Sequence, residues 1–82
     1  MQETDIIYNL LMFLNSSKEE DMYYSICLSM LQNLEKVPNC SINELADLCF
    51  TSTATISRFS KKFGYANFHE FKKEIVAAKG ID

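Results

Sequence analysis

Helix-capping residues divide the second half of this 82-residue chain into short segments. Ser41 is followed three residues later by Glu44, which is the sequence form of a capping box, and the same pattern recurs at residues 67–70. Between these two positions, Ser52 is a favoured N-cap and Gly64 suits the left-handed residue that ends many helices. These intervals predict three consecutive helices of only a few turns each.

Apolar residues recur at helical spacing through these segments and also through the first half of the chain. Glycine and proline together number three, and no alternating strand pattern or internal repeat is present. The only proline, Pro38, disfavours helix at Val37. We therefore predict an all-α fold, a five-helix bundle forming one domain over residues 1–82. The expected helices cover about 6–14, 18–36, 41–49, 53–63 and 67–79, with acidic residues 19–21 at the start of the second.

Several classes of protein are disfavoured by the composition. Three widely spaced cysteines and one histidine do not spell out a disulfide framework or a metal site, so we expect no metal and no cofactor. No nucleophile with a partner base, no paired carboxylates and no glycine-rich phosphate loop is recognisable, and we expect no enzyme activity. No apolar run is long enough to span a bilayer, and the amino terminus lacks the basic start of a signal peptide, which indicates a cytoplasmic protein.

Charge is distributed unevenly between the two halves of the chain. Residues 1–50 carry two basic and eight acidic side chains, a net charge of −6, whereas residues 51–82 carry six basic and three acidic side chains, a net charge of +3. The overall charge of −3 therefore hides a basic carboxyl-terminal half.

The third and fourth expected helices have the form of a helix-turn-helix, over about residues 41–64. A connection of roughly three residues joins them, the length at which two helices meet at a steep angle. Ala46 is small enough to let the next helix cross closely, and Ile56 can pack into that contact. Phe50 departs from the pattern, because it stands in the turn where glycine relaxes more easily. Phe50 is either exposed or inserted into the core.

The fourth helix, about 53–63, is predicted to be a recognition helix that enters the major groove of DNA. On a helical projection its apolar residues gather around Ile56, while small, hydroxyl and basic side chains occupy the opposite face. Arginine can reach guanine or phosphate, hydroxyls can bond phosphates or bases, and a methyl can touch thymine. The candidate DNA-binding residues are Ser52, Thr53, Ala54, Thr55, Ser57, Arg58, Lys61 and Lys62.

The stretch "SINELADLCFTSTATISRFSKKFGYANFHEFKKEI" closely resembles the helix-turn-helix domain of RpiR-type regulators, relatives of a ribose-phosphate-isomerase repressor. The likeness covers about 60 of the 82 residues when the preceding helix is included. Its specific part runs from residue 52 to residue 72. The matching positions are Leu45, Ala46, Ser52, Thr55, Ile56, Arg58, Phe59, Lys61, Lys62, Gly64, Tyr65, Phe68, Phe71 and Lys72.

This resemblance implies a homeodomain-like fold in a bacterial transcription regulator of sugar or sugar-phosphate metabolism. It implies a double-stranded DNA operator as partner, and a sugar-phosphate effector sensed by a sugar-isomerase-like domain that is not present in this chain. We therefore expect the chain to be an amino-terminal fragment of a longer regulator that acts as a dimer or higher oligomer.

Three alternatives stay open. The first helix, with the stripe Ile6, Leu10, Phe13 and Leu14, either pairs with a second copy to form a homodimer or packs on the second helix. His69, Lys72 and Lys73 either border DNA or are solvated. The rival to DNA binding is a small helical protein-interaction or dimerisation module, which needs an exposed apolar patch.

Overall fold

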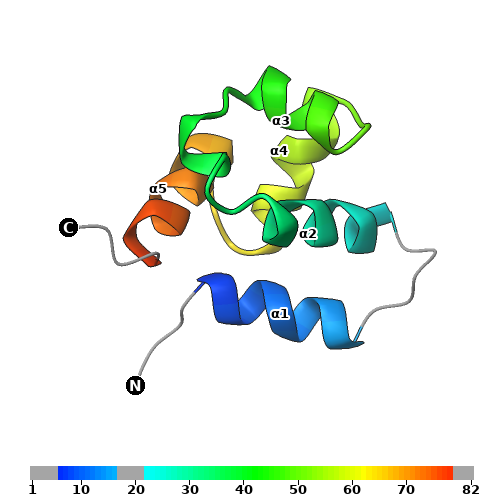
Figure 1. The fold of residues 1–82 in the computed structure, drawn as a ribbon, viewed down its shortest axis with the longest axis vertical. Coiled ribbons are helices and arrows are strands. Elements are labelled where there is room, and N and C mark those ends of the chain that lie inside the picture. The colour runs from blue at the N-terminus through cyan, green and yellow to red at the C-terminus, as the bar shows by residue number, and fades with distance from the viewer. Residues whose placement is uncertain (1–5, 17–21, 79–82) are drawn as a thin grey trace.

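The computed structural model describes residues 6–16 and 22–78, and all regular structure in these ranges is helical. The elements are α1 (Ile6–Ser16), α2 (Met22–Gln32), a 3₁₀ turn η1 (Val37–Asn39), α3 (Ile42–Leu48), α4 (Thr53–Lys62) and α5 (Phe68–Ala78). The all-α, five-helix prediction is confirmed. In Figure 1, α1 lies beside α2, and α3 and α4 lie together on the far side of α2.

Helix boundaries follow the caps in the second half of the chain. Both hydrogen bonds of the Ser41–Glu44 capping box form, Ser52 caps α4, and the Asn67 side chain accepts a hydrogen bond of 2.9 Å from the Glu70 backbone N–H. These local bonds satisfy amide groups that a helix leaves unpaired at its start, which is why the boundaries were readable from the sequence.

The second helix differs from its prediction. It ends at Gln32 rather than near Lys36, and residues 33–36 form turns. The Asn33 side chain donates to the Ser29 carbonyl, and its own carbonyl accepts from the amides of Lys36 and Val37. Val37 then begins η1, with Pro38 in its first turn. Proline is tolerated there because an amide in the first turn has no partner within the helix. The expected acidic start at residues 19–21 and the stop at residues 79–80 lie outside the described residues.

Aromatic rings from four helices meet in and around the largely aliphatic core. The ring of Phe59, on α4, lies with its centroid 5.7 Å from that of Tyr23 on α2, 5.0 Å from that of Phe63, and 5.9 Å from that of Phe71 on α5. Phe13 on α1 reaches Phe63 at 5.6 Å. Such tilted and edge-on contacts are the favoured geometry of ring pairs, so this cluster ties α1, α2, α4 and α5 together.

The first helix packs on its own domain through the predicted stripe. Ile6 and Leu10 are buried, and the Cys27 thiol on α2 donates a hydrogen bond of 3.1 Å to the Leu10 carbonyl. Burial raises the pKa of Cys27 to about 11, so this sulfur stays a protonated donor at neutral pH. None of the described helices combines the length and apolar character required to cross a bilayer.

Phe50 occupies a position that normally belongs to glycine. After α3, the Phe50 N–H bonds to the Asp47 carbonyl and the Thr51 N–H to the Ala46 carbonyl, which is a Schellman motif. The same pair of bonds closes α4, where Gly64 is the left-handed residue with φ 96°. Phe50 has φ 57° and its side chain is 95% exposed, so the alternative in which it fills the core is wrong.

Replacing Phe50 with glycine is expected to stabilise the domain by about 1 kcal/mol. Left-handed backbone is strained for a residue with a Cβ, and glycine removes that strain at some cost in unfolded-chain entropy. The side chain loses little packing because it is exposed. The midpoint of urea unfolding, followed by circular dichroism, measures the change.

Gly64→Ala is the matched control, since a Cβ there meets no atom within 4 Å and only the backbone conformation is at issue. This variant is expected to lose stability. A lower midpoint for Phe50→Gly than for the parent chain would show that the Phe50 side chain contributes contacts that outweigh its backbone strain.

Candidate nucleic-acid interface

Helices α3 and α4 form the helix-turn-helix, with Cys49–Ser52 as the connection, one residue longer than expected. Ala46 and Ile56 are 4% and 0% exposed, and they lie in the core with Leu45, Cys49 and Phe59, as the spacing predicted. Burial raises the pKa of the Cys49 thiol to about 11, which suits a packing role. The apolar face of α4 is thereby fixed against the core, and its other face is turned outward.

The eight candidate residues fall into three groups. Exposed side chains belong to Ser52, Ala54, Arg58, Lys61 and Lys62. Thr53 and Ser57 are half-buried, while Thr55 is 6% exposed. Seven of the eight therefore reach the surface, and the sequence expectation that Thr55 faces outward differs from its place in the structure.

The buried Thr55 hydroxyl bonds within the first turns of α4. Its Oγ1 lies 3.0 Å from Ser52 Oγ and 3.4 Å from Arg58 Nη2, and its backbone N–H donates to Ser52 Oγ at 3.2 Å. This chain of bonds was not predicted from the sequence. Its signal is the spacing of Ser52, Thr55 and Arg58 at i, i+3 and i+6, which stacks polar side chains along one helix edge.

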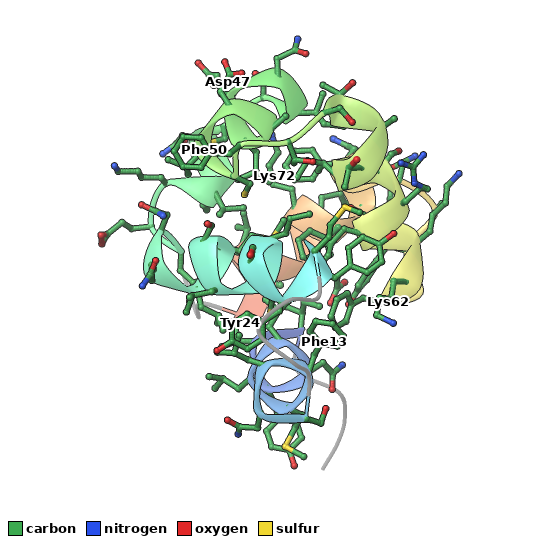
Figure 2. All side chains as sticks on the ribbon, turned by 90° about the vertical axis from the view of Figure 1, so that its right-hand side faces the viewer. Phe13, Tyr24, Asp47, Phe50, Lys62 and Lys72 are labelled. Atoms are coloured by element: carbon green, nitrogen blue, oxygen red, sulfur yellow. The ribbon has the colours of Figure 1, made fainter. Side chains whose placement is uncertain are left out.

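Lys62 contributes its charge at the edge of the outward face. Its ammonium lies 5.2 Å from the ring centroid of Phe13 and 5.9 Å from that of Tyr23, so it stabilises the packing of α1 and α2 through cation–π attraction. Figure 2 shows Lys62 close to Phe13. Arg58, near the middle of α4, and Lys61, in its last turn, are also exposed on this helix.

The basic residues of α5 hold local contacts. Lys72 donates a hydrogen bond of 2.9 Å to the Cys40 carbonyl and lies 5.5 Å from the Phe68 ring centroid, which ties α5 to the segment before α3. Lys73 forms an exposed ion pair with Glu70 at 3.6 Å, and His69 is exposed. Lys72 therefore holds contacts within the domain, which neither alternative drawn from the sequence included.

Charges of opposite sign occupy different helices of the motif. Arg58, Lys61 and Lys62 give α4 three cations and no acidic residue, whereas α3 carries Glu44 and Asp47, both exposed. Figure 2 shows Asp47 and Phe50 on one side of the molecule and Lys62 on the other. A polyanion is therefore attracted to α4 and repelled by α3.

The outward face of α4 suits hydrogen bonding and charge pairing. The ten-residue helix is about 15 Å long, and its first amides add donors beside Ser52. In the described residues no group of three or more histidine, cysteine, aspartate or glutamate side chains could hold a metal ion. This face offers positive charge and hydrogen-bond donors to a bound molecule.

Comparison with known proteins identifies the same kind of domain. The helix-turn-helix domain of the rpiR family matches residues 9–79. An uncharacterized HTH-type transcriptional regulator from Caldanaerobacter subterraneus subsp. tengcongensis is 41% identical over 49 residues, which is 60% of this chain and 17% of the relative. The chain thus spans a small part of that relative's length. No solved structure gives a significant match.

Proposed function

We propose that this chain, which belongs to the rpiR family of helix-turn-helix domains, binds operator DNA sequence-specifically with α4 in the major groove. The observation that carries the proposal is the outward face of α4, where exposed cations and small polar side chains stand opposite a fully buried apolar face. A helix of this width fits a major groove of about 12 Å.

The side chains divide between the two kinds of contact that such an interface uses. Arg58 lies near the middle of α4 and can donate two parallel hydrogen bonds to a guanine, while Ala54 offers a methyl group to thymine. Ser52, with the helix amino terminus, and Lys61 suit phosphates on either side. In this proposal Thr55 does not contact DNA directly, because its side chain is buried.

Regulation of sugar or sugar-phosphate metabolism is the biological role we propose for the intact regulator. It rests on the resemblance to RpiR-type regulators, in which a separate domain senses a phosphorylated sugar. The matched relative is named as a transcriptional regulator and is much longer than this chain. No described residue is assigned to the effector.

Pairing of two copies through α1 is the second part of the proposal. Ile6 and Leu10 are used by the domain's own core, so a partner copy would meet the other face of the helix. That face carries Tyr8, Leu11 and Met12, which are 58%, 45% and 48% exposed. Two paired domains would read two half-sites, which strengthens binding beyond that of one module.

A protein-interaction module remains the alternative function. Phe50 and Met22 are exposed apolar side chains that border a shallow hollow of about 210 Å³ between α2 and the turn after α3. Such a surface would bind protein with little dependence on salt, whereas DNA binding by cations falls steeply as salt rises.

A salt titration of binding to a mixed, fluorescently labelled duplex pool separates the two functions. We expect the logarithm of the affinity to fall linearly with the logarithm of salt concentration, and the slope to shrink by about 0.9 for each phosphate-contacting cation removed. The test variant carries alanine at Arg58, Lys61 and Lys62. Sedimentation equilibrium of the parent chain and of Leu11→Lys reports whether α1 pairs two copies.

Lys36→Ala is the matched control, because Lys36 is exposed but lies outside the helix-turn-helix. Its slope should equal that of the parent chain. Identical slopes for the parent and the triple variant would place DNA on another surface. If the parent chain forms a dimer and still does not bind the duplex pool at low salt, the interaction module would be favoured.

A further inference from the structure

A continuous hydrogen-bonded chain runs along the first two turns of α4. Arg58 Nη2 lies 3.4 Å from Thr55 Oγ1, which lies 3.0 Å from Ser52 Oγ, and Ser52 Oγ also accepts the Thr55 amide at 3.2 Å. The middle residue is 6% exposed, while the two end residues are exposed. A buried hydroxyl therefore connects two groups at the surface.

The protons of this chain have a preferred direction. A guanidinium can only donate, so Thr55 Oγ1 accepts from Arg58. If Ser52 also donated to Thr55 Oγ1, the Thr55 hydroxyl hydrogen would have no acceptor within this chain of bonds. A buried donor without an acceptor costs free energy. Donation from Thr55 to Ser52 avoids this cost. The Ser52 hydroxyl then keeps its own proton to donate to an acceptor outside the protein.

We infer that Thr55 is a positioning residue that holds the Arg58 guanidinium over the first turns of α4 and orients the Ser52 hydroxyl toward a DNA phosphate. This inference rests on the proposed function of α4. Arginine is long and flexible, and anchoring one of its five N–H groups restricts its conformers before DNA is bound. The remaining N–H groups can still form a fork toward a guanine.

Sequence discrimination should therefore depend on a hydroxyl that touches no DNA. Thr55→Val keeps the shape of the side chain and removes only the hydroxyl, whereas Thr55→Ser keeps the hydroxyl. The net charge and the phosphate-contacting cations are unchanged in both variants. A purely structural role would alter the stability of the fold, but not the ratio of affinities for two duplexes of different sequence.

The experiment compares the affinity for a duplex selected by the parent chain from a randomised pool with that for a scrambled duplex of the same length. For Thr55→Val we expect this ratio to fall by about 2-fold to 10-fold, the effect of one lost hydrogen bond, with an unchanged salt slope. Thr55→Ser should retain the ratio. Ser60→Ala is the matched control, because the buried Ser60 hydroxyl donates to the Ile56 carbonyl at 3.1 Å on the core side of α4.

The outcomes separate the two proposals. An unchanged ratio in Thr55→Val with a reduced ratio in Arg58→Ala would overturn the positioning role and leave the proposed function standing. A parent chain that prefers no duplex over its scrambled form would overturn both. If Thr55→Val fails to fold by circular dichroism, Thr55→Ala and Thr55→Ser form a second pair that differs in the hydroxyl, and equal ratios in that pair would overturn the positioning role.

Discussion

Replacing Arg58 with alanine is expected to weaken binding to the preferred duplex by about 1 to 3 kcal/mol, because one bidentate base contact is worth that much discrimination. Arg58 is exposed on α4, and among the described residues its side chain donates a hydrogen bond of 3.4 Å to the Thr55 hydroxyl, so the domain should keep its fold when Arg58 is replaced. Affinities for the selected and scrambled duplexes, measured at one fixed salt concentration, give the change.

Lys61→Ala is the control that distinguishes base reading from charge. Lys61 is exposed in the last turn of the same helix. Removing a lysine that contacts phosphate weakens binding to all sequences about equally. If Arg58→Ala lowered the two affinities by the same factor, its guanidinium would be a phosphate contact. Equal binding by Arg58→Ala and the parent chain would remove Arg58 from the interface.

Replacing Phe59 with alanine should destabilise the domain by about 3 to 5 kcal/mol, a large share of the 5 to 15 kcal/mol typical of small domains. The Phe59 side chain is completely buried and its ring contacts those of Tyr23, Phe63 and Phe71. Alanine would leave a cavity where three helices meet. Thermal and urea unfolding followed by circular dichroism measure the loss.

Val76→Ala serves as the comparison for this core substitution, since Val76 is an apolar residue of α5 that is 37% exposed. The loss of stability in Val76→Ala should be well below that in Phe59→Ala, because Val76 buries less apolar surface on folding. A Phe59→Ala midpoint close to that of Val76→Ala would mean that the surrounding rings close the cavity. The loss of DNA binding expected for Phe59→Ala would follow from unfolding alone.

The helix-turn-helix could be read from local sequence signals because local bonds define it. Ser41 and Ser52 bond to amides three residues away, and Gly64 ends α4 within its own turn. The burial of Ala46 and Ile56 in one core was also predictable, since the connection between the two helices is short enough to bring the helices together. The end of α2 was missed because Asn33 forms bonds that compete with the helix, a choice that apolar spacing does not reveal.

Within the interface, the sequence by itself determined which helix is basic, which of its faces is apolar and where it starts. These properties depend on residue type and a fixed angle per residue. Only the tertiary structure decided that Thr55 is buried, that Lys62 lies against Phe13 and Tyr23, and that Phe50 stays outside the core. The physical reason is that the burial of a side chain at the edge of a helix depends on which distant segment packs beside it, and helical spacing carries no information about that segment.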